Sequence, residues 1–549
     1  MGGSWLDKKP YYVTTPIFYV NASPHIGHMY SMVLADVLKR WQTLKGKKAL
    51  LLTGTDEHGM KVQQAAAVED VPPKQWCDIN AEKFRDLARR TNIDNDFFMR
   101  TTDPDHADAV RHFWFLLKEK GYIYESKHQG WYCVSDETFY PESMLEKRVH
   151  PLTGKVHLAS VESGNPVEWT EEKNYHFRMT ALKDKLMAFY NENPDWILPA
   201  KRMNEVVSWV SNNLEDLSIS RPVSRLSWGI PVPDDPSQTI YVWVDALINY
   251  LTKAGFPSWI PGREYEGGWP ADVQVIGKDI VRFHGVYWPA LLLALDIPPP
   301  RRLLSHAHWT LGGKKMSKST GNVVNPYFAL DRWGVDTMRF YMIHDGGISD
   351  DSDYGNIYIV ERYRKCLQNG LGNLLGRITR PKLWNVREAV KSAARVSLAE
   401  DNWPDNIRSL FKRQRLTIDH AADSAYYHME SLNPSKALKC IMDAVFVTNK
   451  YLGLIKPWDV ARLEKTPENE LLLNESIYFA SETLRVVGIL LQPFMPDKAA
   501  ELLDVLGVPP THRTLKYARI GLDFDYGEPL RNPGKGAYDG LFPPLEVDT

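Results

Sequence analysis

The hydrophobic positions near the amino terminus change from strand-like to helix-like spacing and back. Residues 11–20, YYVTTPIFYV, are aromatic and β-branched, which predicts a buried strand. Residues 21–46 then carry apolar side chains at helical spacing, among them Val33, Val37 and Trp41, which predicts a helix that ends at Gly46. A second apolar run at 49–52 leads into GTDEHG, residues 54–59. The order strand, helix, strand predicts a parallel α/β sheet.

The same pattern resumes far downstream, where residues 271–279 and 302–310 predict two strands on either side of an apolar helix from Ile280 to Leu295. The turn-rich residues between the two halves predict a small α+β insertion. Beyond about residue 350 the apolar spacing becomes helical, which predicts a helical bundle. The predicted ranges are a first half of the sheet domain at 10–125, the insertion at 126–230, a second half at 231–325, a linker at 326–360, the helical domain at 361–525 and a tail that wraps back at 526–549.

Composition narrows the class of protein. At 549 residues the chain is too long for one core, and 44% hydrophobic with 24% charged residues is typical of a soluble globular protein. The net charge of -2 gives no global attraction for a polyanion, so any nucleic-acid contact must be local. Apolar runs fall short of the ~20 residues that span a bilayer, which predicts no membrane segment. The polar first ten residues predict no signal or transit peptide in this sequence.

Two segments carry candidate phosphate chemistry. In PHIGH, His25 and His28 lie three residues apart in the first turn of a helix, where free backbone N–H groups favour an anion and Gly27 allows close approach. In KKMSKS, residues 314–319, Lys315 and Lys318 lie in a polar loop after a strand and suit an attacked phosphate and its leaving pyrophosphate. Taken alone, each segment is better explained without a function, the first as two surface histidines near a turn and the second as a solvated basic turn.

Together these two segments, in this order, resemble the paired motifs of class I aminoacyl-tRNA synthetases over residues 10–525. The resemblance implies a Rossmann-like sheet split by a connective insertion and followed by a helical domain that reads tRNA. It implies that His25, Gly27 and His28 bind ATP phosphates and that Lys315 and Lys318 act in catalysis. In IGKD, it implies that Gly277 and Asp279 contact the adenosine, a role that fits the carboxyl end of a strand.

Further segments resemble the methionine pocket of methionyl-tRNA synthetases. Four residues of YVWVDALINYL share one helix face at i, i+3, i+4 and i+7, a pattern that core residues also show. A thioether suits an aromatic wall with a hydroxyl or imidazole near the sulfur. The resemblance implies that Asp56 binds the substrate ammonium and that the rest of the pocket comprises Ile17, Tyr19, Trp243, Ala246, Leu247, Tyr250, Ile280 and His284.

In the helical domain, Asn369, Asn373 and Arg377 recur every four residues in QNGLGNLLGR, and Trp458 follows in IKPWDV. These residues resemble the family's anticodon reader, in which amides, a guanidinium and an aromatic platform contact unstacked bases. A polar helix face and a buried tryptophan are the alternatives for these residues taken singly.

Metal sites have little support in the sequence. The four cysteines are far apart and form no CxxC pair, and the insertion contains only Cys133, so we expect no structural zinc even though many relatives bind zinc there. The resemblance implies ATP with Mg²⁺ as the substrate form. The insertion is also too short for a large editing domain.

The sequence is therefore interpreted as a methionine-tRNA ligase that takes L-methionine, ATP and tRNA(Met), and we expect a monomer. It looks closest to bacterial and mitochondrial members of the family, so the expected location is the mitochondrial matrix in a eukaryote and otherwise the cytoplasm. Two alternatives remain open at this point: a class I synthetase for leucine, valine or cysteine, and a catalytically silent tRNA-binding relative.

Overall fold

A parallel sheet of seven strands forms the centre of the computed structural model, which describes residues 9–149, 154–260, 262–316, 322–395, 403–532, 534 and 539–545. Its order is β10-β16-β15-β1-β3-β2, with β4 also pairing with β3, and every pairing is parallel. The strands are β1 (Tyr11–Thr14), β2 (Phe18–Tyr19), β3 (Ala49–Asp56), β4 (Phe97–Arg100), β10 (Ile197–Leu198), β15 (Val273–Gly277) and β16 (Leu303–His306). The predicted α/β class is confirmed, but residues 11–20 form two short strands rather than one.

Neighbouring residues of these strands face opposite sides of the sheet, as the two-residue period of a strand requires. Val13 and Leu51 belong to one hydrophobic core, while Tyr12 and Leu52 belong to the other. Helix α2 (Ile26–Leu44) is buried along most of its length because it packs on the sheet and also contacts α11 (Val335–Asp345). The first core therefore continues from the sheet into the helical domain.

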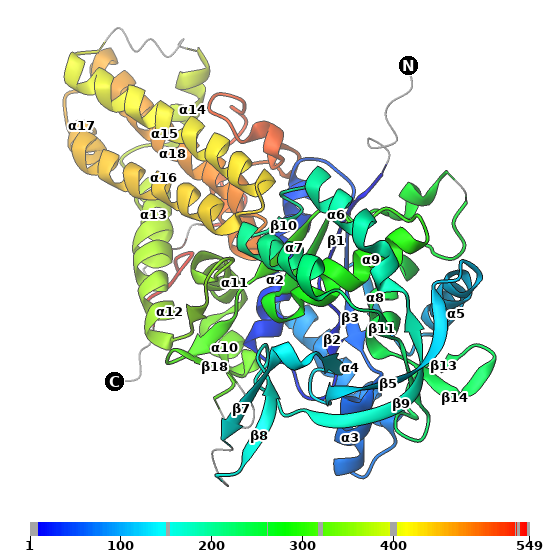
Figure 1. Cartoon of the computed structure of the whole chain (residues 1–549). Helices are drawn as coiled ribbons and strands as arrows, with labels where there is room; N and C mark the ends of the chain where they lie inside the picture. The colour runs from blue at the N-terminus through cyan, green and yellow to red at the C-terminus, as the bar shows by residue number, and fades with distance from the viewer. Residues whose placement is uncertain are drawn as a thin grey trace.

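The insertion contains a four-stranded sheet of order β11-β9-β5-β6 and a separate β7-β8 hairpin (Figure 1). Its elements are β5 (Ile123–Cys133), β6 (Thr138–Tyr140), β7 (Leu145–Val149), β8 (Val156–Ser160), β9 (Glu168–Phe177), α6 (Lys183–Glu192), α7 (Ala200–Asn213) and β11 (Leu217–Ser218). One strand within the range 126–230, β10, pairs with β16 of the central sheet. The chain thus returns to the central sheet inside the range expected to be the insertion.

The apolar segment expected to be one helix from Ile280 to Leu295 is helical from Val281 to Ala294, and a π-helical turn lies within it. A 3₁₀ turn at Lys278–Ile280 precedes it, the π-helical turn is Phe283–Tyr287, and helix α9 (Trp288–Ala294) follows. The predicted strand at 302–310 also divides: β16 stays in the central sheet, whereas β17 (Trp309–Leu311) joins β18 (Lys314–Lys315) and β19 (Ser352–Asp353). These breaks place polar side chains at the carboxyl edge of the sheet.

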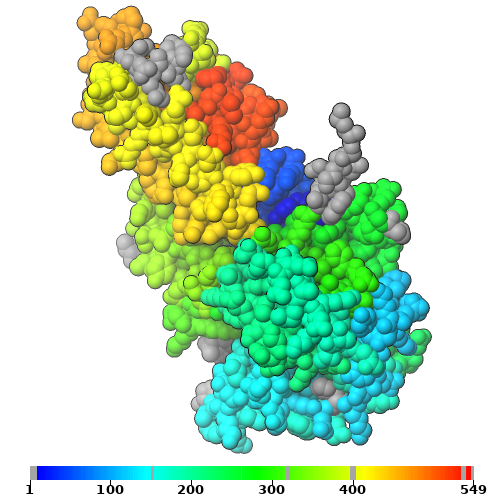
Figure 2. Space-filling model, turned by 45° about the horizontal axis from the view of Figure 1, so that its top comes forward, coloured from blue at the N-terminus to red at the C-terminus, as the bar shows by residue number. Residues whose placement is uncertain are grey.

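Residues after 355 form the predicted helical domain, which projects from the opposite end of the molecule to the insertion (Figure 2). Its main elements are α12 (Asn356–Arg362), the π-helical segment η7 (Tyr363–Gly372), α13 (Asn373–Thr379), α14 (Val386–Arg395), α15 (Asp405–Glu430), α16 (Pro434–Ile455), α17 (Pro457–Val460), α18 (Pro467–Leu491) and α19 (Pro496–Leu506). The tail returns to this domain, where Leu541 and Phe542 are buried and the Tyr363 hydroxyl donates to the Pro543 carbonyl at 2.7 Å. Among the described helices, none is long and apolar enough to cross a membrane.

Candidate functional site

The carboxyl ends of four neighbouring strands bring most of the predicted site together. β1 lies between β3 and β15, so the sheet is extended in both directions from β1. Ligands of open parallel sheets bind at such a point. Tyr19 of β2 is in register with Asp56 at the end of β3, and Gly277 at the end of β15 is in register with His306 of β16.

His25 and His28 form the amino-terminal cap of α2. The helix begins at Ile26, with His25 as its N-cap. The Gly27 N–H donates to His25 Nδ1 and the His25 N–H donates to His28 Nδ1, both at 3.0 Å. Because each Nδ1 accepts, a neutral ring carries its proton on Nε2, which is a donor suited to a phosphate oxygen. A Cβ at Gly27 would lie 2.8 Å from His25 Cε1, so a larger residue there would displace the His25 ring.

Asp56 is a buried carboxylate without a cationic partner among the described residues. Its side chain is 6% exposed, and Oδ1 has no hydrogen-bond partner among the described residues. Burial, together with the nearby carboxylates of Asp245 and Glu137, raises the pKa of Asp56 well above its ordinary value. A positively charged group bound beside these carboxylates restores the balance of charge and favours ionisation of Asp56. The site therefore suits an ammonium ion.

The predicted helix face is present on α8 (Val242–Thr252), opposite the π-helical turn. The Trp243 ring stacks on Phe283 with centroids 3.7 Å apart, and the Tyr250 hydroxyl lies 2.8 Å from His284 Nε2. His284 Nδ1 lies 3.1 Å from the Ile280 carbonyl, which can only accept, so Nε2 accepts from Tyr250. Burial lowers the pKa of His284 to about 4, which keeps the imidazole neutral.

The remaining residues predicted for the methionine pocket are either buried or partly buried. Ala246 and Leu247 of α8 are buried. Ile17, Tyr19, Trp243 and Ile280 are only partly buried and pack against the edge of the second core. Partly exposed apolar side chains beside a buried tyrosine and histidine form an apolar surface with one polar end, which fits an unbranched thioether side chain.

The predicted adenosine and phosphate residues lie along the same edge. A Cβ at Gly277 would lie 2.6 Å from Asp279 Oδ1, so glycine leaves room for that carboxylate. Asp279 Oδ1 also lies 3.2 Å from His308 Nε2, which was not predicted. Lys315 is exposed on β18, at the start of the loop. Lys318 falls outside the described residues.

Two acidic residues that the sequence patterns did not indicate, Glu137 and Asp245, connect segments around the proposed pocket. Glu137 of the insertion is buried, and its Oε1 accepts from the Tyr19 hydroxyl at 3.0 Å and from the Lys61 N–H at 2.8 Å. Asp245 is buried on α8 and lies 2.6 Å from His58 Nδ1 and 2.7 Å from His106 Nε2. The one signal in the sequence is an acidic residue inside the apolar stretch of α8, because such a residue needs a buried partner.

Three of the four predicted anticodon residues lie together in the helical domain, where Asn373 and Arg377 both contact Asn449 and Arg377 also contacts Trp458. The Asn373 amide donates to Asn449 Oδ1 at 3.3 Å, Arg377 Nη1 donates to the Asn449 carbonyl at 3.3 Å, and the Arg377 guanidinium lies 5.1 Å above the Trp458 ring. Asn369 is exposed in the preceding π-helical segment. Asn449 is a polar residue of α16 that the sequence analysis did not select.

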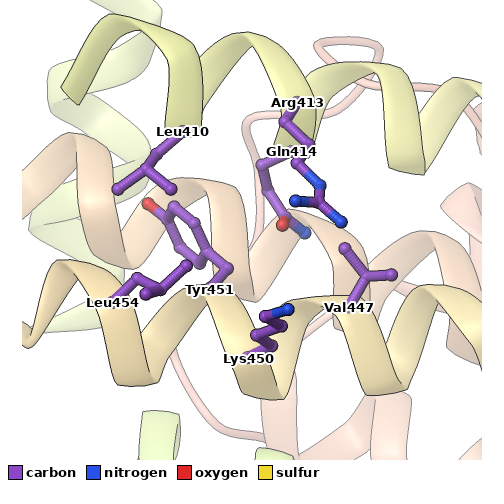
Figure 3. Close-up of a pocket in the computed structure, with 7 residues that line it drawn as sticks. All are labelled: Leu410, Arg413, Gln414, Val447, Lys450, Tyr451 and Leu454. Atoms are coloured by element: carbon purple, nitrogen blue, oxygen red, sulfur yellow. The ribbon is translucent and has the colours of Figure 1, made fainter. Parts of the chain in front are cut away.

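A separate hollow lies between α15 and α16, but it has room for about 10 Å³ only (Figure 3). Its lining residues are Leu410, Arg413, Gln414, Val447, Lys450, Tyr451 and Leu454. That volume is close to the minimum for one water molecule. The hollow is therefore a packing defect between two helices rather than a ligand site.

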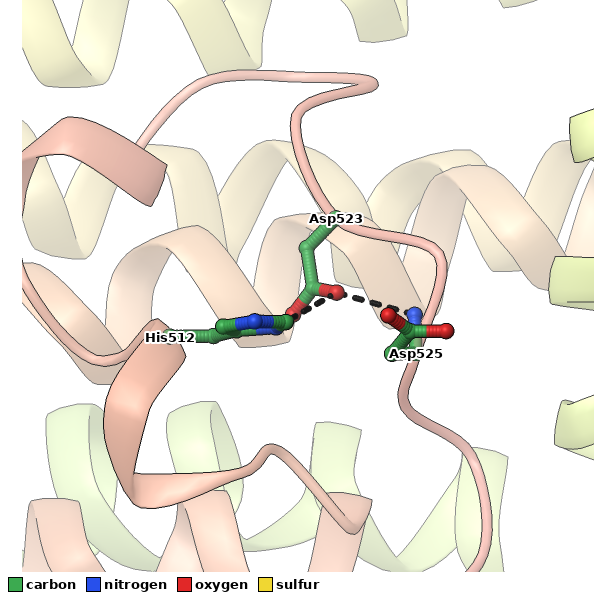
Figure 4. Close-up of side chains that lie close together, drawn as sticks. All are labelled: His512, Asp523 and Asp525. Atoms are coloured by element: carbon green, nitrogen blue, oxygen red, sulfur yellow. Dashed lines mark hydrogen bonds and ion pairs between the residues drawn. The ribbon is translucent and has the colours of Figure 1, made fainter.

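Candidate metal ligands gather in one place within the described residues. His512, Asp523 and Asp525 each offer a ligand atom, and these atoms lie within 4.8 Å of one another. Asp523 Oδ1 lies 3.1 Å from His512 Nδ1 and accepts from the Asp525 N–H at 2.8 Å (Figure 4). Because these residues are hydrogen-bonded to one another, the cluster is explained as a link between two loops of the carboxyl-terminal segment. It lies outside the insertion, where relatives were expected to bind zinc.

A family model for "tRNA synthetases class I (M)" matches residues 11–379. The chain is 62% identical over 542 residues to a probable mitochondrial methionine-tRNA ligase of Neurospora crassa. The alignment covers 99% of this chain and 86% of that protein. It is 40% identical to the mitochondrial methionine-tRNA ligase of Homo sapiens, over 97% of this chain and 90% of that protein.

A solved structure of Mycobacterium tuberculosis methionyl-tRNA synthetase in complex with methionyl-adenylate is also similar. The TM-score is 0.85 at 38% identity, with 98% of this chain and all of that chain covered. The similarity therefore extends over both the sheet domain and the helical domain.

Proposed function

The chain belongs to the class I tRNA synthetases of the methionine type, and we propose that the edge of its central sheet between β1, β3, α8 and the π-helical turn is where it joins L-methionine to tRNA at the expense of ATP. The observation that carries this assignment is the unpartnered Oδ1 of Asp56 beside a pocket that ends in Tyr250 and His284. The site accommodates both an ammonium and a thioether. Leucine and valine have the ammonium but no thioether.

The first step is adenylate formation. The methionine carboxylate attacks the α-phosphorus of ATP, a carboxyl O–P bond forms, and the bond to pyrophosphate breaks. Asp56 orients the ammonium, while the Nε2–H groups of His25 and His28 donate to phosphate oxygens. Asp279 accepts from a ribose hydroxyl, with Gly277 leaving space for the nucleoside. Lys315 and Lys318 neutralise the charge that develops on the phosphates, and Mg²⁺ arrives with ATP.

The second step is transfer to tRNA. A hydroxyl oxygen of the terminal ribose attacks the acyl carbonyl, an ester bond forms, and AMP leaves with the electron pair. The helical domain supports selection of tRNA(Met), because Asn373 and Arg377 present donors beside the Trp458 ring. Asn369 extends the same surface by one turn.

The test of this function is methionine-dependent exchange of pyrophosphate into ATP, run on a panel of amino acids. Methionine alone should support rapid exchange. Asp56→Asn keeps the size of the side chain but removes its charge, so exchange should fall by about two orders of magnitude. Exchange with leucine, valine or cysteine at a comparable rate would contradict the assignment, and exchange with no amino acid would favour a silent relative.

We also infer that the insertion needs no zinc. The insertion holds one cysteine, Cys133, whereas a structural zinc site needs four ligands, and no group of three potential ligands comes together among the described residues of the insertion. Elemental analysis of the purified protein should find much less than one zinc per chain, and about one zinc per chain would overturn this inference.

We propose two further properties, the location of the protein and its oligomeric state. Several of the relatives are mitochondrial enzymes and one bacterial relative is also similar, which supports the mitochondrial matrix as the location. The pocket and the helical site are both built within one chain, which supports a monomer. Fractionation of organelles tests the location, and light scattering at working concentration tests the mass.

A further inference from the structure

The carboxyl-terminal segment holds three potential metal ligands that the proposed function does not use. His512 ends a 3₁₀ turn at Pro510–His512, and Asp523 and Asp525 lie in the loop after the next such turn, Leu515–Tyr517. One nitrogen or carboxylate oxygen from each of the three residues lies within 4.8 Å of the others. Figure 4 shows the Asp523 carboxylate between the His512 ring and the Asp525 carboxylate. These three residues are called the carboxyl-terminal cluster below.

The link between the two loops uses only one oxygen of the Asp523 carboxylate. Oδ1 accepts from the Asp525 N–H at 2.8 Å and lies 3.1 Å from His512 Nδ1. The Asp523 side chain is 1% exposed, and its Oδ2 has no hydrogen-bond partner among the described residues. A buried carboxylate oxygen without a partner is unfavourable, because nothing replaces the hydration that it loses on folding. Oδ2 is therefore suited to a positively charged partner.

Arg485, a buried cation of the same domain, is engaged by other groups. Its Nε and Nη2 donate to the two carboxylate oxygens of Glu482 at 2.8 and 2.7 Å. Its Nη1 and Nη2 also donate to the carbonyls of Tyr517 and Arg519 at 2.6 and 2.7 Å. The guanidinium is thus neutralised by Glu482 and makes no hydrogen bond to Asp523 Oδ2. A partner for Oδ2 has to come from solution.

The other two members of the cluster can be reached from solution. Asp525 is exposed, and the His512 side chain is 23% exposed. The His512 ring stacks on Tyr517, with centroids 4.5 Å apart and planes 22° from parallel. Because this contact fixes the plane of the ring, little side-chain freedom is lost when a ring nitrogen binds an ion. A small cation can therefore enter beside a ring that is already held in place.

The types of ligand select the class of ion. One imidazole nitrogen with two carboxylate oxygens suits a divalent transition metal, whereas Mg²⁺ and Ca²⁺ prefer oxygen ligands alone. Such ligand atoms lie about 2.0–2.2 Å from the ion, so two of them on opposite sides of it are about 4.4 Å apart. The 4.8 Å limit of the cluster is close to that span, so small rotations of the side chains close the site. Three protein ligands leave positions for water, which makes the ion exchangeable.

We propose that the carboxyl-terminal cluster binds one exchangeable divalent transition-metal ion, such as Mn²⁺, and that this ion fastens the carboxyl-terminal segment to the helical domain. Asp523 lies three residues before Tyr526, whose hydroxyl donates to Glu482 of α18 at 2.9 Å. An ion that fixes Asp523 therefore also holds the segment against α18. Because the ion exchanges, dialysis against a chelator removes it, and the expectation for zinc in the insertion does not depend on it.

The experiment strips the protein with EDTA, dialyses it into buffer without Mg²⁺ or ATP, and titrates it with Mn²⁺ while the electron paramagnetic resonance signal of free Mn²⁺ is recorded. The wild-type protein should bind one Mn²⁺ per chain at this site. Asp525→Asn keeps the N–H that bonds Asp523, and His512→Gln keeps a donor for Asp523. Each should weaken Mn²⁺ binding about tenfold or more, since even a lost outer hydrogen bond costs roughly tenfold. Saturating Mn²⁺ should raise the Tm of the wild-type protein by about 2 °C or more, and that of the two variants by less.

Asp443→Asn is the matched control. Asp443 is an exposed carboxylate on α16 of the same domain and lies outside the cluster, so its variant loses the same charge as Asp525→Asn and should bind Mn²⁺ like the wild-type protein. Weak binding that is alike in all four proteins would come from scattered surface carboxylates and would overturn the proposal. An unchanged affinity in His512→Gln or in Asp525→Asn, or an equal loss in the control, would overturn it as well.

Discussion

The Tyr19 hydroxyl donates a hydrogen bond of 3.0 Å to Glu137 Oε1, and this bond joins the proposed methionine pocket to the insertion. Glu137 Oε2 accepts from Tyr132 of the insertion, and its Oε1 also accepts from the Lys61 N–H at the start of α3 (Met60–Val68). One buried carboxylate therefore fixes the positions of three segments. The insertion is thus part of what shapes the pocket, in addition to any role in binding tRNA.

This hydrogen bond predicts that changes at Tyr19 and at Glu137 have non-additive effects on methionine binding. Tyr19→Phe keeps the ring but removes the hydroxyl, and we expect it to raise the KM for methionine about fivefold in pyrophosphate exchange, with a smaller change in kcat. Glu137→Gln should act in the same direction. Because both changes weaken the same hydrogen bond, the double variant should be less impaired than the sum of the two. Strict additivity would show that the bond does not position Tyr19.

The second prediction concerns pH and stability. Burial lowers the pKa values of His284 and His306 to about 4, from an ordinary value of 6.5. Between these values the unfolded chain binds more protons than the folded protein, so the free energy of unfolding falls as pH falls from 6.5 towards 4. Each histidine contributes about 2 kcal/mol to the loss at pH 5.

His306→Gln tests this dependence by urea denaturation at pH 7.5 and pH 5. Glutamine retains a partner for Ser31 Oγ, which lies 2.7 Å from His306 Nε2, but it cannot take up a proton. The variant should lose about 2 kcal/mol less than the wild-type protein between the two pH values. If the two proteins lost the same amount, His306 would titrate normally in the fold.

The third prediction concerns Lys318 of the KKMSKS segment. Lys318→Ala should leave methionine affinity nearly intact and slow adenylate formation, because the ammonium is needed chiefly in the transition state. Loss of one such donor costs about 3 kcal/mol, or roughly two orders of magnitude in rate. Rapid-quench measurement of one turnover checks the rate. Lys314→Ala, four residues earlier on β18, is the control and should have little effect.

Residue patterns were sufficient to predict the parallel sheet, the interruption and the helical domain, because each depends on local periodicity. The strand breaks at Thr15–Ile17 and after His306 could not be predicted, because they depend on the pairing of β2 with β3 and of β17 with β19. Strand β10 was missed for the same reason: two apolar residues carry no strand period, and only the partner β16 defines them.

The residues of the candidate site also fall into two groups, those that the sequence indicated and those that it did not. Residues in recognisable motifs, such as His25 and Asp56, could be selected from the sequence, and their roles stay predictions. Glu137, Asp245 and Asn449 were not selected, because their partners lie far away in the chain: Glu137 bonds Tyr19, Asp245 bonds His58, and Asn449 bonds Asn373. A single polar residue in an apolar stretch indicates that a partner exists but not which residue it is.

The last prediction separates the two substrates, since the methionine pocket and Trp458 lie in different domains. Trp458→Ala removes an aromatic platform worth about 1–3 kcal/mol and also the ring beneath the Arg377 guanidinium, so the KM for tRNA should rise about tenfold or more. Methionine-dependent pyrophosphate exchange should remain near normal, because that reaction needs no tRNA. Trp384→Ala is the matched control: Trp384 is also partly buried near α13, but its indole N–H donates to the Ile378 carbonyl. A similar rise in that control, or a collapse of exchange in Trp458→Ala, would mean that Trp458 supports the fold of the bundle and that the anticodon is read elsewhere.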